Sequence, residues 1–123
     1  MEQNQQLRLK ELTNELRRYN ELARQQFVED TCKTDYQVNF YERVKPFADA
    51  VLALADEWRP LAMQWVIEMK PTYVYGIQIK DTYENITISS VQAFQTDTKK
   101  KRFLEMIKSI DYVLATIEQQ LPK

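Results

Sequence analysis

Apolar residues recur every three or four positions along most of this chain, and this spacing constrains the fold more than any other feature. The last segment shows it most clearly, because the apolar face has no interruption from Phe103 to Leu121. Such spacing places the apolar side chains on one face of an α-helix. The members of this stripe are Phe103, Met106, Ile107, Ile110, Val113, Leu114, Ile117 and Leu121. We expect a helix capped by Asp97 or Thr98 and stopped by Pro122.

The first segment carries a similar stripe, and most of its charged residues lie away from that stripe. Its apolar positions are Leu9, Leu12, Leu16, Tyr19, Ala23 and Phe27. We expect a helix over residues 2–28, because the pattern fails after Val28. The stretch from Glu29 to Asp35 is then predicted to be a loop, with Thr31 and Thr34 forming local hydrogen bonds.

The second segment begins with a capping signal. Asn39 can accept a hydrogen bond from the first helical turn, and Glu42 stands three residues later, as in a capping box. An apolar stripe follows at a constant phase. Its members are Phe40, Val44, Phe47, Val51, Leu54, Trp58, Leu61, Trp65 and Met69. We expect Trp58 and Trp65 to lie in the core.

Two prolines, Pro46 and Pro60, interrupt this second stripe without changing its phase. A proline inside a helix costs ~3 kcal/mol and one backbone hydrogen bond, whereas the first turn accepts proline readily. One helix over residues 39–69 would span about 46 Å, longer than its partners, and a start near Pro46 leaves about 36 Å. We favour a turn at 39–45, a bend, and a helix to about residue 69 that bends again near Pro60. One kinked helix and two separate helices both remain open.

The third segment has the weakest pattern. Lys70-Pro71 ends the second helix, and Pro71 to Gly76 indicates an ordered connector. The next apolar or small positions are Ile79, Thr82 or Tyr83, Ile86, Ser89 or Ser90, Ala93 and Phe94. Residues 83–89 could locally form a strand, but no other segment alternates to pair with it. We therefore expect a third helix, with its small residues allowing close packing.

Four such helices joined by short connections indicate an all-α fold, an antiparallel up-and-down four-helix bundle. With 123 residues and no internal repeat, residues 1–123 are expected to form a single helical-bundle domain. The order of helices does not fix the handedness of the bundle.

The absence of histidine and the presence of only one glycine, Gly76, limit the chemistry of the chain. Without histidine it lacks the commonest general base and metal ligand, and with one glycine it lacks phosphate-binding loops. A carboxylate-only metal site would need acids that flank the apolar stripes. These acids are Glu15, Asp56, Glu68, Glu84 and Asp111. We expect no metal, no cofactor and no catalytic residue, and hence no enzyme.

Charge and cysteine content point to the cytoplasm. The formal net charge is −1, so nothing draws the whole chain toward nucleic acid or an anionic membrane. The lone Cys32 cannot form an internal disulfide, which fits a reducing compartment. The first residues lack the apolar core of a signal peptide, and no stretch approaches the ~20 apolar residues of a membrane span.

The most concentrated charge is the basic cluster Lys99, Lys100, Lys101 and Arg102, at the start of the fourth predicted helix. The helix dipole adds to their positive charge, which makes this place suited to an anion. The alternatives are a solvated helix start, a phosphate or nucleotide, an acidic protein, and weak sequence-independent nucleic-acid binding. Nucleic acid is disfavoured because no aromatic residues for base stacking alternate with the cations.

Tyrosines gather around the two ends of the second predicted helix. They are Tyr36, Tyr41, Tyr73, Tyr75 and Tyr83. One interpretation is packing at the edge of the core, with the hydroxyls at the rim. The other is an exposed aromatic patch for a protein partner, since tyrosine is common among residues that dominate binding energy.

Several short runs, taken together in order and spacing from about Tyr36 onward, resemble the YppE-like family of small bacterial proteins. The runs are Phe40-Tyr41-Glu42, Val44-Lys45-Pro46, Trp58, Pro71-Thr72-Tyr73-Val74, Lys100-Lys101-Arg102-Phe103, Ser109 and Tyr112. The resemblance implies a four-helix bundle. It implies no activity, substrate or catalytic residue.

We expect a non-enzymatic cytoplasmic protein that acts through its surface as a protein-interaction module, as a monomer or homodimer. The tyrosine-rich helix ends and the basic cluster support this hypothesis. The alternative is a small-molecule or anion-binding protein that uses residues 99–102 for phosphate or nucleotide.

Overall fold

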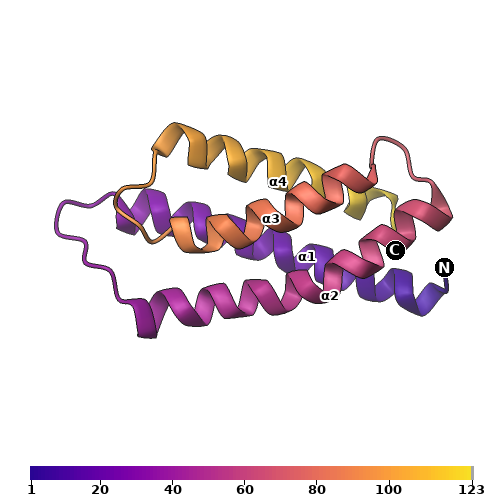
Figure 1. Cartoon of the computed structure of the whole chain (residues 1–123), viewed down its shortest axis with the longest axis horizontal. Coiled ribbons are helices and arrows are strands. Elements are labelled where there is room, and N and C mark those ends of the chain that lie inside the picture. Colours follow the sequence, from indigo (N-terminus) through magenta and orange to yellow (C-terminus); the bar gives the residue numbers. More distant parts are fainter. Residues whose placement is uncertain (123) are drawn as a thin grey trace.

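The computed structural model describes residues 1–122, which fold as four long α-helices. Their bounds are Gln3–Gln25 for α1, Lys45–Met69 for α2, Gly76–Gln92 for α3 and Lys100–Gln120 for α4. Successive helices run antiparallel, and each packs along two neighbours, with α1 and α3 touching only sparingly across the diagonal (Figure 1). The predicted all-α antiparallel bundle is confirmed. The possible strand at residues 83–89 lies within α3.

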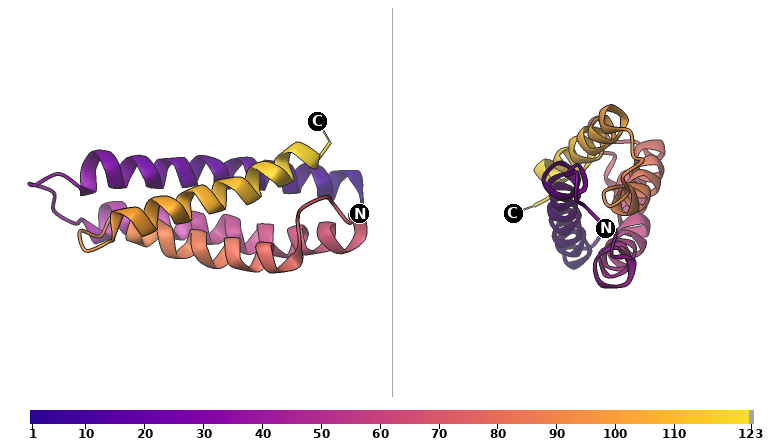
Figure 2. Two further views of the ribbon diagram at one scale, coloured as in Figure 1. Left: turned by 90° about the horizontal axis from the view of Figure 1, so that it is seen from above. Right: turned by 90° about the vertical axis from the view of Figure 1, so that its left-hand side faces the viewer.

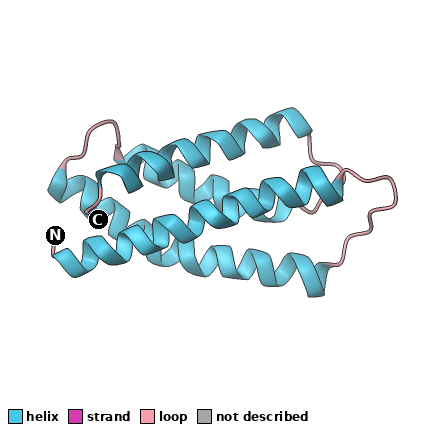
Figure 3. Ribbon diagram, turned by 180° about the vertical axis from the view of Figure 1, so that it is seen from behind, coloured by secondary structure: helices cyan, strands magenta, loops and turns pink. Residues whose placement is uncertain are grey.

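The bundle has two distinct ends (Figures 1 and 2). We call one the loop end, because it holds the α1–α2 connection and the α3–α4 connection. We call the other the terminal end, because it holds the start of α1, the end of α4 and the connector between α2 and α3. The view from behind in Figure 3 shows the same division.

Two π-helical segments lie at the loop end, namely η1 (Gln26–Thr31) after α1 and η2 (Phe40–Val44) before α2. The predicted loop from Glu29 to Asp35 is therefore wrong in its first part. Thr31 is buried and its hydroxyl donates to the Ala93 carbonyl at 2.6 Å, so the backbone is held helical beyond Val28. The wider π turn also explains why the α-helical spacing fails there.

The start of the second helix follows the capping signal. The Asn39 side-chain oxygen accepts from the Glu42 amide at 3.2 Å, which confirms the cap. The Glu42 carboxylate accepts from the Asn39 side-chain amide at 2.9 Å, instead of from the backbone as in a full capping box. η2 then continues directly into α2, with Pro46 in the first turn of α2.

Pro60 lies inside α2, which remains a single helix and changes direction partway along its length (Figure 1). This confirms the kinked alternative. The prediction that the apolar stripe faces the core is wrong at its two ends, however, since Phe40 and Met69 are about half exposed. Both lie at the very ends of the helical run, where the neighbouring helices no longer cover them.

The core is filled by the predicted stripes, with Trp58 completely buried and Trp65 nearly so. The indole N–H of Trp58 donates to the Thr13 hydroxyl at 3.1 Å, and that hydroxyl donates to the Leu9 carbonyl at 2.7 Å. A buried polar group without a partner would be costly, so this short chain of hydrogen bonds lets the tryptophan occupy the centre. It also joins α2 to α1.

The small residues of α3 pack as expected. Thr82, Ser89 and Ser90 are all buried on the inner side of α3. The hydroxyls of Ser89 and Ser90 donate to carbonyls of their own helix, at 3.2 and 2.7 Å. Their hydrogen bonds are thus satisfied without a partner across the interface, which permits close helix approach.

The predicted cap of the fourth helix is wrong. Neither Asp97 nor Thr98 caps it, because Lys99 is the N-cap residue and makes no side-chain capping bond. The Thr98 hydroxyl instead donates to the Gln92 carbonyl at 2.7 Å, which ties the connection back to α3. Within residues 1–122, no helix is both long enough and apolar enough to span a membrane.

The Trp58–Thr13 hydrogen bond leads to a prediction about the free energy of unfolding. Thr13→Val leaves the indole N–H buried without an acceptor and should cost about 1–3 kcal/mol of unfolding free energy. In a Trp58→Phe background the same change should cost much less, because no orphaned donor remains. Urea unfolding of the four variants measures this coupling.

Thr116→Val is the matched control, since its hydroxyl donates only to the Tyr112 carbonyl of its own helix at 2.7 Å. We expect a change within about 0.5 kcal/mol for this variant. Equal costs of Thr13→Val in both backgrounds would contradict the account.

Candidate functional site

The connector between α2 and α3 has an unusual backbone. Lys70 and Tyr73 both adopt positive φ, at 44° and 63°. This left-handed conformation costs an ordinary residue roughly 1–2 kcal/mol. The left-handed Lys70 caps the C-terminus of α2, and Tyr73 lies in the turn that follows. Backbone strain of this kind persists only where the surroundings hold it, and it is often found at functional positions.

The strained connector is held from several sides. The Gln120 carboxamide of α4 makes two bonds to Thr72, accepting from its amide at 2.9 Å and donating to its carbonyl at 2.7 Å. Val74 is buried in the main core, and the Tyr75 amide donates to the Gln78 side chain at 2.8 Å. These contacts offset the strain and fix the position of the residues between them.

Large apolar side chains project from this part of the chain. Tyr73 is 69% exposed and Ile67 is 67% exposed, at the terminal end of the bundle. We call the exposed group the connector surface. Its members are Ile67, Met69, Tyr73, Tyr75 and Ile77. Scattered single apolar residues are ordinary on protein surfaces, whereas five large exposed ones within eleven consecutive residues make this segment a candidate interaction site. Figure 1 shows the connector at the terminal end of the bundle, leading from the last turn of α2 back to the start of α3.

The five predicted tyrosines do not form one patch. Tyr36 and Tyr41 lie at the loop end, whereas Tyr73 and Tyr75 belong to the connector surface. The Tyr36 hydroxyl donates to the Phe94 carbonyl at 3.0 Å, which fits packing at the core edge. Tyr41 is 80% exposed, with its ring edge-to-face against Phe40.

Tyr83 lies partway along α3 and is bound within the bundle. Its hydroxyl donates to the Asp56 carboxylate of α2 at 2.6 Å, and this hydrogen bond raises the pKa of Tyr83 above its usual value. The Arg59 guanidinium lies 4.9 Å from the centre of the same ring. Tyr83 therefore joins α2 to α3 and is separate from the connector surface.

The basic cluster is placed as predicted, at the first turn of α4 and at the loop end. Its four side chains are exposed, and within residues 1–122 none of them has a carboxylate at ion-pair distance. Most other arginines are paired, as Arg17 is to Asp111 at 2.9 Å. Lys99 and Arg102 line a hollow of about 310 Å³ that also includes Asp97. Unpaired cations at a helix N-terminus favour anion binding.

The carboxylates that flank the stripes are mostly bound to other partners. Glu15 accepts from Arg18 at 2.8 Å, which lowers the pKa of the Glu15 carboxyl. Asp111 accepts from Arg17, and Asp56 from Tyr83. In the described part of the chain, no three His, Cys, Asp or Glu side chains come together as a set that could hold a metal ion.

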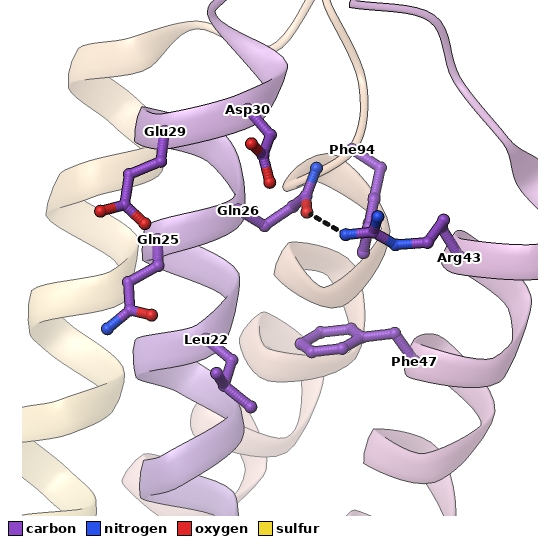
Figure 4. Close-up of a pocket in the computed structure, with 8 residues that line it drawn as sticks. All are labelled: Leu22, Gln25, Gln26, Glu29, Asp30, Arg43, Phe47 and Phe94. Carbon is purple, nitrogen blue, oxygen red and sulfur yellow. Dashed lines mark hydrogen bonds between the residues drawn. The ribbon is translucent and has the colours of Figure 1, made fainter.

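Sequence reasoning missed two adjoining hollows at the loop end, of about 280 and 370 Å³. Both are lined by Gln26, Asp30, Arg43 and Phe94, and the first is drawn in Figure 4. The failure of helical spacing after Val28 marks the region in the sequence. Nothing in the sequence shows that Gln26 and Arg43 face each other, because they belong to different helices.

Comparison with known proteins places the chain among bacterial proteins of unknown function. A family model described as a bacterial domain of unknown function, DUF1798, matches residues 13–121. The uncharacterized protein YppE of Bacillus subtilis is 24% identical over 90 residues, which is 73% of either chain.

Solved structures share the fold closely. A crystal structure of a protein of unknown function from Listeria innocua has a TM-score of 0.88 at 26% identity, covering 96% of this chain and 94% of that one. A DUF1798 protein from Staphylococcus aureus has a TM-score of 0.78 at 26% identity, covering 90% of this chain and 93% of that one. Both are described as proteins or domains of unknown function.

We call the two hydrogen bonds between Gln120 and Thr72 the clamp, and they lead to a prediction about the connector. In Gln120→Ala, the Thr72 amide loses its acceptor, and its hydrogen exchange should accelerate about tenfold or more, since each lost bond is worth about 1 kcal/mol. Amides in the middle of α4 should keep their protection. The neighbouring exposed residue provides the control variant, Gln119→Ala. A Thr72 amide that is already unprotected in the unaltered protein would contradict the clamp.

Proposed function

This chain belongs to the bacterial DUF1798 family, whose function is unknown, and we propose from its own surface that it is a non-enzymatic protein-interaction module. The resemblance first identified from Phe40-Tyr41-Glu42 and the later runs is thereby confirmed and extends over residues 13–121. The proposed binding site is the connector surface.

The observation that carries this proposal is the strained but clamped connector that displays Tyr73 and Tyr75. Both rings are mostly exposed, although Val74 between them is buried and Thr72 before them is held by Gln120. A partner that binds a fixed loop does not have to order it, so less binding energy is lost. Tyrosine also adds a large contact area with few rotatable bonds, which is why it is frequent at binding hot spots.

The partner that fits this surface is a folded protein with a hydrophobic groove. Tyr73 and Tyr75 would enter the groove, and Ile67 and Ile77 would cover its edges. The groove must offer hydrogen-bond partners at its rim, since a buried phenol hydroxyl usually needs one. A localised set of apolar anchors surrounded by polar residues is the usual form of such an interface.

Affinity capture with crosslinking tests the proposal. The unaltered protein should retain a stoichiometric partner from the cytosol of its own cells, and Tyr73→Ser combined with Tyr75→Ser should lose it. Tyr112→Ser is the matched control, since Tyr112 is 63% exposed on α4. With the purified partner, the double variant should weaken binding at least about 100-fold, because hot-spot residues each contribute 2 kcal/mol or more.

The proposal fails if no protein is lost selectively from the double variant. Sedimentation of the purified chain shows whether the partner is a second copy, because a homodimer through this surface would dissociate in the same double variant. Thermal unfolding of each variant confirms that the bundle is intact.

A second candidate function is the binding of a small phosphorylated anion by the basic cluster. It is favoured by one specific observation. Within residues 1–122, the cations of residues 99–102 have no ion-pair partner and stand at a helix N-terminus, whereas Arg8, Arg17, Arg18 and Arg24 are paired. The backbone amides of the first helical turn add donors to those of the side chains.

Thermal unfolding with inorganic tripolyphosphate tests the anion site. A site with a dissociation constant near ~1 mM gives about 1.4 kcal/mol of stabilisation at about 10 mM ligand. Added salt should reduce this effect. Lys100→Gln combined with Arg102→Gln should abolish it, and Lys108→Gln, a change on an exposed turn of the same helix, should not. An unchanged melting temperature at that concentration ends this hypothesis.

A further inference from the structure

The first loop-end hollow has charges of opposite sign on its two facing walls (Figure 4). Asp30 stands on the η1 wall, and Arg43 reaches in from η2 on the other side. Glu29 also lines the hollow, but its side chain is directed away from Arg43. The apolar side chains of Leu22, Phe47 and Phe94 also line it.

Arg43 is held in place but remains largely free to bind. Its guanidinium donates one bond to the Gln26 side-chain oxygen, at 3.0 Å. Gln26 is 8% exposed, and its own amide donates to the Thr31 hydroxyl at 3.2 Å. The guanidinium has five donors, and within residues 1–122 no carboxylate lies at ion-pair distance from it. An arginine oriented by an amide is thus available for a carboxylate from outside.

The walls of the hollow are made by backbone that departs from α-helical geometry. Gln26 and Asp30 belong to η1, and Arg43 belongs to η2. π-helical turns are rare and are frequently found at functional sites. The apolar side is firm, because Phe94 is buried and packs edge-to-face against Phe47, with their ring centres 5.5 Å apart.

We propose that this hollow binds a zwitterionic amino acid with a large apolar side chain. The carboxylate pairs with Arg43, and the ammonium group pairs with Asp30. The side chain lies against the rings of Phe47 and Phe94. A volume of about 280 Å³ is at the small end of ligand sites, as expected for one amino acid.

Other ligand classes fit this arrangement less well. A simple anion would face Glu29 and Asp30, and a simple cation would face Arg43. A neutral apolar compound would form no bond with any of the three charged groups. Asp30 does have one partner, Lys33, at 3.6 Å, but both side chains are about half exposed or more, so this contact is weak. Only a ligand with both charges satisfies both walls.

Amide chemical-shift titration of the full chain with L-phenylalanine tests this site. Three analogues are compared with it. 3-Phenylpropionate lacks the ammonium group, phenethylamine lacks the carboxylate, and N-acetyl-L-phenylalanine methylamide lacks both charges. L-Phenylalanine should shift the amide signals of residues 22–30 and 43–47. It should also bind at least about 10-fold more tightly than any analogue, since the loss of one charge-assisted hydrogen bond weakens binding about 10-fold or more.

Two variants identify which charge contacts which group. Arg43→Gln should weaken L-phenylalanine about 10-fold or more and leave phenethylamine unchanged, because phenethylamine has no carboxylate. Asp30→Asn should show the reverse pattern, weakening phenethylamine and sparing 3-phenylpropionate. Arg59→Gln, which changes an arginine outside the hollow, is the control and should alter neither.

The proposal is overturned if these amides do not shift at about 20 mM L-phenylalanine, well above a weak dissociation constant. It is also overturned if all four compounds bind equally, or if Arg43→Gln leaves the affinity for L-phenylalanine unchanged. The site lies at the end opposite the connector surface, so its test is independent of the proposed protein interaction.

Discussion

The hydrogen bond from Trp58 to Thr13 allows the largest fully buried side chain of the protein to fill the centre of the bundle. Without that acceptor the indole N–H would be buried and unpaired, and the tryptophan would have to move outward. With it, α2 is fixed against α1, and the apolar residues of α3 and α4 complete the core around it. The interior is therefore occupied by packed side chains, and the binding sites that we propose lie at the surface and the bundle ends.

Both ends have structure that packing alone does not require. At the terminal end, Lys70 and Tyr73 adopt a costly backbone conformation that Gln120 and Val74 hold in place. At the loop end, two π-helical segments surround hollows with fixed charges. The connections are of ordinary length for a helix bundle, so their unusual feature is the backbone conformation and not the length. We infer that these two ends carry the function and that the core supports them.

Most of the fold could be predicted from the spacing of apolar residues. The stripe from Phe103 to Leu121 is buried along one face of α4, apart from half-buried Met106, and the small residues of α3 face inward as expected. One error falls where a contact distant in sequence decides the structure, because Thr31 keeps the chain helical by bonding to Ala93, 62 residues away. The other error is local, because Thr98 bonds to Gln92, six residues earlier, instead of capping α4. The apolar spacing reports neither pairing.

The candidate sites could be predicted only in part, for the same reason. The sequence identified Tyr73, Tyr75 and the basic cluster, because tyrosines are frequent at binding hot spots and clustered cations suit an anion. It could not show the clamp on Thr72, since Gln120 lies 48 residues away. The pairing of Gln26 with Arg43 likewise depends on how two helices meet.

The central claim is that the connector is a rigid display of exposed aromatic residues. Backbone ¹⁵N relaxation of the free protein tests it most directly. The account predicts order parameters for Thr72 to Tyr75 near those of the helices, about 0.85, despite the exposure of their side chains. Values below about 0.6 at these residues would contradict it, because a flexible connector could not present Tyr73 and Tyr75 in a fixed arrangement.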